Sequence, residues 1–160
     1  MNDSTLATTS SPATLTLGSG AMFDRIAPRY DLLNRLLSLG IDQSWRTRAA
    51  RALALDPAQP VRVLDLATGT ADLAIRIATL LPQATVVGTD PSSEMLWRGQ
   101  AKVRARGLAP RVTLAIGDAQ AIDSEDAAFD AATIAFGIRN VPDRRLALDQ
   151  MRRVVRPGGR

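Results

Sequence analysis

One twelve-residue stretch at positions 61–72, VRVLDLATGTAD, constrains what this chain can fold into more than any other. The apolar residues of 61–66 suit a strand that is covered on both faces. Small and hydroxyl residues fill positions 67–70, and a helical pattern resumes at Asp72. The stretch therefore predicts a buried strand, a tight turn that lets a ligand approach the backbone, and a helix. An ordinary turn between a strand and a helix is the alternative that this stretch alone leaves open.

A second apolar run at 84–90 ends in Asp90, which lies 21 residues beyond Gly69. In a doubly wound sheet, an acid at the end of the second strand binds the hydroxyl pair of a ribose, at a spacing of roughly 20 residues from the glycine-containing turn. The spacing therefore predicts a ligand that contains a nucleoside.

The turn at 67–72 also indicates which nucleoside is bound. A dinucleotide site needs several glycines so that a pyrophosphate can sit on a helix N-terminus, whereas this turn has one glycine and a carboxylate. A carboxylate would repel a pyrophosphate, which argues against a dehydrogenase. Asp65 and Asp72 instead suit a nucleoside that carries an amino group, as S-adenosylmethionine does.

Composition excludes several classes of function. The chain has 160 residues, 46% of them hydrophobic, which predicts one globular domain. Its net charge of +4 comes from basic residues interleaved with acids along the predicted helices, and its three Phe, two Trp and one Tyr form no stacking surface, so no nucleic-acid partner is expected. Cysteine and histidine are absent, so no thiol or histidine chemistry and no metal site are expected. A displacement between two bound small molecules needs none of these groups.

The predicted organisation has three parts. Residues 1–20 are rich in Ser, Thr, Ala and Gly and predict a disordered tail. Residues 21–58 predict a helical cap, its second helix running from about 42 to 55, which either closes over the cofactor or simply covers the sheet. Residues 59–160 predict an α/β domain. No apolar run approaches the length of a membrane span, which favours a cytoplasmic protein.

Within 59–160, strands alternate with helices, which predicts a parallel sheet with helices on both faces, a Rossmann-like arrangement. Strands are expected at 61–66, 84–90, 111–116 and 129–136, and helices at 72–81, from Ser92 or Ser93 to 106, and at 143–155. A turn at 157–159 normally introduces a further strand, so the last strands of such a domain are expected to be lacking from this chain.

Four segments together resemble a known family: 30–40 leading to Trp45 (YDLLNRLLSLG), 65–73 (DLATGTADL), 136–141 (FGIRNV) and 153–159 (RVVRPGG). Over residues 22–160 the chain resembles the class I S-adenosylmethionine-dependent methyltransferases, and among them the UbiE/MenG/COQ5 family of quinone-biosynthesis C-methyltransferases. The resemblance implies methyl transfer from S-adenosylmethionine to a ring carbon of a polyprenylated quinol, either demethylmenaquinol or a methoxy-polyprenyl-benzoquinol. The turn at 69–72 looks more like the menaquinone branch.

The resemblance also implies roles for individual residues. Two positions depart from the family pattern, because Ala135 stands where some members carry serine and Asp42 replaces a frequent histidine. The resemblance implies that Asp90 binds the ribose of S-adenosylmethionine and that Asp118 and Ala119 lie along its adenine. The residues implied around its methionine end are Asp65, Ala67, Gly69 and Thr70.

For catalysis, Arg139 is expected to stabilise phenolate character on the quinol and Asn140 to hold its hydroxyl. Tyr30 and Asp31 are expected to line the quinol pocket, on resemblance only. An arginine at a helix start paired with a nearby acid is the structural alternative for Arg139. For the whole chain, the alternatives are a methyltransferase for another small molecule and a cofactor-binding module without activity. A peripheral association with the inner face of the membrane follows only from the apolar substrate.

Overall fold

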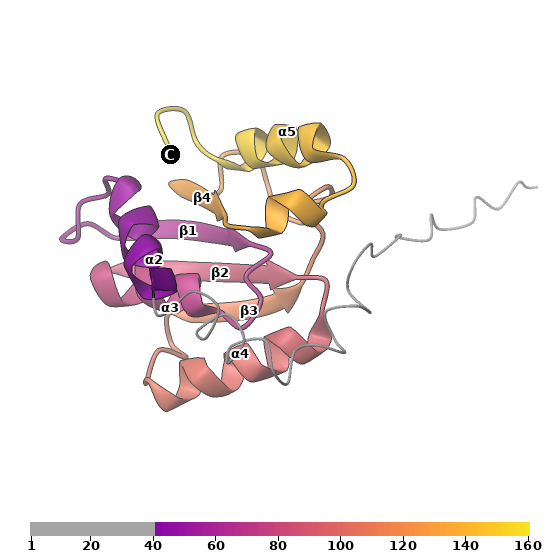
Figure 1. Cartoon of the computed structure of the whole chain (residues 1–160). Coiled ribbons are helices and arrows are strands. Elements are labelled where there is room, and N and C mark those ends of the chain that lie inside the picture. Colours follow the sequence, from indigo (N-terminus) through magenta and orange to yellow (C-terminus); the bar gives the residue numbers. More distant parts are fainter. Residues whose placement is uncertain (1–40) are drawn as a thin grey trace, which may run out of the picture.

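The computed structural model describes residues 41–160, with side chains from residue 44 onward. Its centre is a four-stranded sheet in the order β3-β2-β1-β4, with every neighbouring pair parallel (Figure 1). The strands are β1 (Val61–Leu66), β2 (Ala84–Asp90), β3 (Val112–Ile116) and β4 (Ala131–Ile134). The predicted parallel sheet is therefore confirmed.

Helices cover both faces of this sheet, as predicted. They are α2 (Ile41–Ala52), α3 (Asp72–Leu80), α4 (Ser93–Ala105), the short 3-10 helix η1 (Gly137–Asn140) and α5 (Arg144–Val154). Val61 and Val63 of β1 pack in a core with residues of α2, α3 and α4, whereas Leu64 and Leu66 pack with α5 on the opposite face. The alternation of β1 side chains between two cores explains why this strand is apolar along nearly its whole length.

Local signals set the helix ends. The Ser92 hydroxyl accepts a hydrogen bond from the Met95 amide (3.2 Å) and caps α4, while Asp143 caps α5 by accepting one from the Leu146 amide (2.9 Å). Gly107 follows α4 with a φ of +67°, a left-handed conformation that favours glycine. These caps confirm the predicted boundaries of both helices to within one or two residues.

The fourth strand is shorter than predicted. It covers 131–134 rather than 129–136, and Phe136 lies beyond it with a side chain that is 57% exposed. The prediction that Phe136 extends the strand is therefore wrong. The chain turns sharply here because the Gly137 amide donates a hydrogen bond to the Ala135 carbonyl, and η1 begins at once. At the other end, Phe129 is buried and its amide donates to the Val154 carbonyl (2.9 Å).

Candidate functional site

The loops that follow β1, β2 and β3 meet at one edge of the sheet. Leu66 pairs with Thr89 and Asp90 with Ile116, so these three strands end at the same level. The amide of Thr68 donates to the Thr89 carbonyl (3.0 Å), and the amide of Gly117 donates to the Asp90 carbonyl (3.2 Å). These bonds bring the predicted loop residues of 67–70, Asp90 and the 118–119 segment together, at the edge where open α/β sheets bind their ligands.

Asp90 ties two of these loops to each other. Its side chain is only 7% exposed, its Oδ2 accepts a hydrogen bond from the Gly69 amide (2.8 Å), and its Oδ1 accepts one from the Ser92 amide (2.9 Å). A carboxylate oxygen can accept more than one hydrogen bond. Asp90 thus fixes the loop and can also accept from the hydroxyl pair of a ribose.

The loop after β1 has a backbone conformation that lets a ligand approach it closely. Ala67, Gly69 and Ala71 all have left-handed φ values, of 50°, 56° and 65°. A Cβ placed on Gly69 would meet nothing within 4 Å, so the space beside this residue is open. The open space above a strand-to-helix turn is where the backbone can contact a nucleoside cofactor, and the residues present fit such a group.

Asp65 is an acid buried at the end of β1, 1% exposed. Its carboxylate accepts hydrogen bonds from the hydroxyls of Thr133 (2.6 Å) and Thr68 (2.7 Å). Burial raises the pKa of Asp65 from its ordinary 3.8 to about 6, and the charge of Asp90 adds to this rise. Within the described part of the chain, no lysine or arginine pairs with Asp65. Two neighbouring acids, one of them deeply buried, favour a cationic ligand.

Asp72 plays a different part from the one expected. Its carboxylate pairs with Lys102 of α4 (2.8 Å) and Arg46 of α2 (3.5 Å), so its charge is already compensated by the protein. Lys102 also donates to the hydroxyl of Thr70 (2.8 Å), which directs that hydroxyl toward α4. Asp65, rather than Asp72, is the loop acid that best suits an amino group.

Asp118 and Ala119 lie in the loop after β3. The Asp118 Oδ1 accepts from the Gln120 amide (2.8 Å), and the Gln120 side chain contacts both carboxylate oxygens (3.2 Å). Ala119 is buried in the core on the α5 side of the sheet. Asp118 is thus a turn former in this structure, and its contact with adenine stays a prediction.

The segment 136–140 lies on the β4 side of the loop that follows β1, and it contacts that loop at Ala67. A Cβ on Gly137 would overlap the Cβ of Ala67, so only glycine lets η1 lie this close to the loop. The Phe136 ring packs edge-to-face on Trp45 of α2, with centroids 4.5 Å apart. Arg139 is exposed, with its guanidinium 5.9 Å from the centre of the Phe136 ring. The catalytic roles of Arg139 and Asn140 stay predictions, and Tyr30 and Asp31 lie outside the described residues.

Gly137→Ala is expected to push η1 away from the loop, because the new methyl group and Ala67 cannot occupy the same space. We expect a loss of about 1–3 kcal/mol in the free energy of unfolding, measured by urea denaturation, and weaker cofactor binding. Gly107→Ala is the matched control, since it meets strain from its positive φ but no neighbour within 4 Å. Equal cofactor affinity in the two variants would contradict the proposed contact between η1 and the loop.

Three features of this site were not predicted from the sequence. The register that pairs Asp65 with Thr133 places a hydroxyl beside the buried acid, and the spacing of the predicted strands could have revealed it. The hydrogen bonds of Lys102 to Thr70 and Asp72 join residues that are 32 and 30 positions apart in the sequence. No local sequence pattern predicts such contacts. The close approach of Gly137 to Ala67 likewise depends on the packing of separate segments.

Comparison with known proteins identifies the family. The ubiE/COQ5 methyltransferase family matches residues 16–160 of this chain. A ubiquinone/menaquinone biosynthesis C-methyltransferase UbiE of Geobacter sp. (strain M21) is 50% identical over 141 residues, covering 88% of this chain and 59% of the relative. A demethylmenaquinone methyltransferase of Thermus thermophilus is 55% identical over 139 residues, covering 87% and 61%.

Solved structures agree on the fold. The crystal structure of a putative S-adenosyl-L-methionine-dependent methyltransferase from Methanococcus maripaludis has a TM-score of 0.74 and 17% identity, covering 94% of this chain and 65% of that one. The chain spans about three fifths of the length of the curated relatives described above. The predicted class I methyltransferase fold is confirmed, and this chain belongs to the ubiE/COQ5 methyltransferase family.

Proposed function

We propose that this chain binds S-adenosylmethionine and transfers its methyl group to a ring carbon of a polyprenylated quinol. The observation that carries the cofactor assignment is the pair of buried acids, Asp65 and Asp90, beside the open space at Gly69. S-adenosylmethionine has both the ribose hydroxyls that suit Asp90 and the cationic groups that suit Asp65. The family supports methyl transfer as the reaction.

The cofactor-binding residues would contact different parts of S-adenosylmethionine. Asp90 accepts from the ribose hydroxyls, and Asp65 accepts from the amino group of the methionine end. The backbone of 67–70 contacts the same end, and Asp118 with Ala119 borders the adenine. When bound, S-adenosylmethionine would supply a methyl group on a sulfonium: the ring carbon would bond to that methyl group as the methyl–sulfur bond breaks, and neutral S-adenosylhomocysteine would leave. The protein's task is then to align the two reactants and to exclude water.

The substrate side would depend on η1. Arg139 follows β4 at the same edge as the loops of β1 and β2, since all of these strands are parallel. A guanidinium there stabilises negative charge on a quinol oxygen as its proton leaves, which makes the ring carbon a better nucleophile. Asn140 would hold a quinol hydroxyl. Tyr30 and Asp31 are proposed as walls of the quinol pocket, from the family resemblance.

Arg139→Ala is expected to lower kcat for quinol methylation about 100-fold, because a charge-stabilising donor at the reacting oxygen is lost. The affinity for S-adenosylmethionine should stay within about twofold, since Arg139 lies outside the cofactor loops. Arg139→Lys should recover part of the rate, and Arg145→Ala, another exposed arginine, should change nothing. Full turnover by Arg139→Ala would reject the catalytic assignment and leave the cofactor assignment untouched.

The substrate branch is open to direct assay. We propose demethylmenaquinol, because the 69–72 turn resembles that branch and because the Thermus thermophilus relative is a demethylmenaquinone methyltransferase. Transfer of a labelled methyl group should be measured with demethylmenaquinol and with a methoxy-polyprenyl-benzoquinol, each kept reduced. Methylation of the first alone supports the menaquinone branch. Methylation of neither, by a folded protein that binds the cofactor, would reject the quinol assignment.

An apolar substrate implies work at a membrane surface, so we propose a cytoplasmic protein that associates peripherally with the inner face of the membrane. In residues 41–160, no helix has the length and apolar composition needed to cross a bilayer. No nucleic-acid partner is proposed, because acids accompany the basic residues along the chain.

A further inference from the structure

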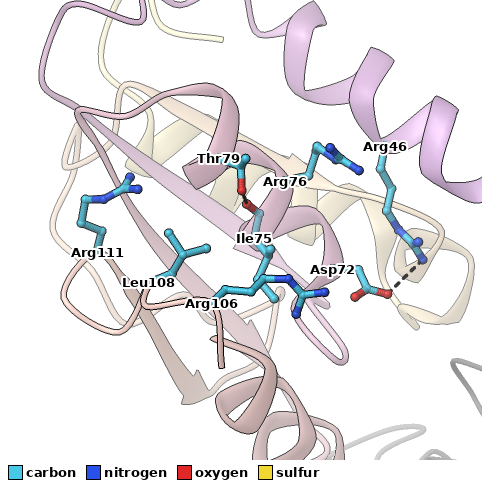
Figure 2. A pocket seen from close by; sticks show the side chains of 8 residues that line it. All are labelled: Arg46, Asp72, Ile75, Arg76, Thr79, Arg106, Leu108 and Arg111. Carbon is cyan, nitrogen blue, oxygen red and sulfur yellow. Dashed lines mark hydrogen bonds and ion pairs between the residues drawn. The ribbon is translucent and has the colours of Figure 1, made fainter. Parts of the chain in front are cut away.

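A pocket of about 540 Å³ lies outside the strand-end loops, along α3. It opens between α2, α3 and the segment that joins α4 to β3 (Figure 2). It touches the cofactor loops only near Asp72, the first residue of α3. Eight residues line it: Arg46, Asp72, Ile75, Arg76, Thr79, Arg106, Leu108 and Arg111.

The lining of this pocket is strongly basic. Four arginines and a single carboxylate, that of Asp72, line the pocket. The carboxylate of Asp72 also forms an ion pair with Lys102 (2.8 Å). Figure 2 shows Arg46, Arg76 and Arg106 toward the Asp72 end of the pocket and Arg111 at the other end, beside Leu108. A concave surface of one charge sign concentrates the electric field and attracts anions.

Arg46 and Arg111 make contacts that hold the pocket together. Arg111 Nη1 donates to the carbonyls of Ala78 (2.9 Å) and Ala84 (3.1 Å) and thereby joins the end of α3 to the start of β2. Arg46 pairs with Asp72 (3.5 Å). These two residues hold the walls of the pocket in place while adding to its positive potential.

Arg106 can donate several hydrogen bonds to a ligand. It follows the last turn of α4, and its Nη1 donates one hydrogen bond, of 3.3 Å, to the Lys102 carbonyl. A guanidinium carries five N–H groups in a planar fork, which matches the oxygens of a phosphate in a bidentate geometry. Guanidinium groups bind phosphate oxygens through charge-assisted hydrogen bonds, which are stronger than neutral ones.

We propose that this pocket binds a phosphate group, with Arg106 as its main donor. The phosphate belongs either to a soluble ion or metabolite or to the headgroup of an anionic lipid, and both present the same oxygens to the guanidinium groups. This inference does not depend on methyl transfer, because the cofactor residues Asp65 and Asp90 are not part of the pocket.

The test is a titration of the protein with inorganic phosphate, followed by ¹H–¹⁵N chemical shifts at constant ionic strength. Saturable shifts should appear at the amides of Ile75 and Leu108. Arg106→Gln should weaken binding at least 10-fold, whereas Arg104→Gln, an exposed arginine of α4 outside the pocket, should stay within twofold. If Arg106→Gln proves unstable, Arg106→Lys, which keeps the charge but loses the planar fork, provides a second comparison and should also weaken binding.

Vesicles of phosphatidylcholine with and without phosphatidylglycerol separate the two sources of phosphate. Sedimentation with phosphatidylglycerol vesicles that is lost in Arg106→Gln identifies a lipid headgroup. Saturable binding of inorganic phosphate, with vesicle binding insensitive to Arg106, identifies a soluble phosphate. Equal effects of Arg104→Gln and Arg106→Gln, or no saturable response to either probe, would overturn the proposal.

Discussion

Asp90→Ala is expected to reduce the affinity for S-adenosylmethionine by at least about 30-fold, because a charged acceptor for the ribose hydroxyls is worth roughly 2 kcal/mol or more. The same change removes the acceptors of the Gly69 and Ser92 amides, which lie 2.8 and 2.9 Å from the carboxylate. The loop would therefore lose its anchor as well as its ligand contact. Isothermal titration calorimetry of the variant measures the combined effect.

The matched control is Asp123→Ala, which removes an exposed acid from the loop before β4 and should leave the affinity unchanged. Thermal melts of both variants separate folding from binding. We expect Asp90→Ala to lower stability by about 1–3 kcal/mol, since a buried amide is left without its acceptor. A folded Asp90→Ala protein that binds S-adenosylmethionine within threefold of the original would contradict the ribose assignment.

Asp65→Asn is expected to make the fold more stable at neutral pH and to impair cofactor binding. The pKa of Asp65 is about 6 in the folded protein and near 3.8 when unfolded, so the folded state binds the proton more tightly. The stability of the original protein therefore falls as pH rises from about 4 to 6, by about 2–3 kcal/mol in total. An asparagine has the same shape and no charge, and its amide can exchange hydrogen bonds with the hydroxyls of Thr133 and Thr68.

Denaturation at a series of pH values checks the sign of this effect. The two proteins should be about equally stable at pH 4, and Asp65→Asn should exceed the original by about 2–3 kcal/mol at pH 7. In the original, affinity for S-adenosylmethionine should rise between pH 5 and 7 as the carboxylate ionises. Asp123→Asn, at an exposed site, should show neither trend. A variant less stable than the original at pH 7 would contradict the account of Asp65 as a destabilising buried charge.

The strand and turn at 61–72 could be predicted because their signals are local. A run of apolar residues, one glycine and a resumed helical period occupy twelve consecutive positions. The position of Asp90 followed from a spacing along the chain, and the parallel sheet then brought it to Gly69. Ser92 and Asp143 were likewise predictable, because a cap acts on residues within its own helix.

Contacts between distant segments were not predictable in the same way. Residues 129–136 have the composition of a long strand, but the chain turns at Ala135 and leaves Phe136 against Trp45. Asp72 was expected to face a ligand, whereas Lys102 and Arg46 reach it from two other helices. The packing of the helices on the sheet determines such partners. The periodicity of a single segment does not predict that packing.

One calorimetric titration shows whether the acids at this sheet edge hold S-adenosylmethionine. The folded protein should be titrated with S-adenosylmethionine and, in parallel, with NADH as the dinucleotide that the turn at 67–72 disfavours. We expect saturable binding of S-adenosylmethionine with a stoichiometry near one, and no saturable binding of NADH. Binding of NADH alone, or of neither compound by a protein shown to be folded, would contradict it.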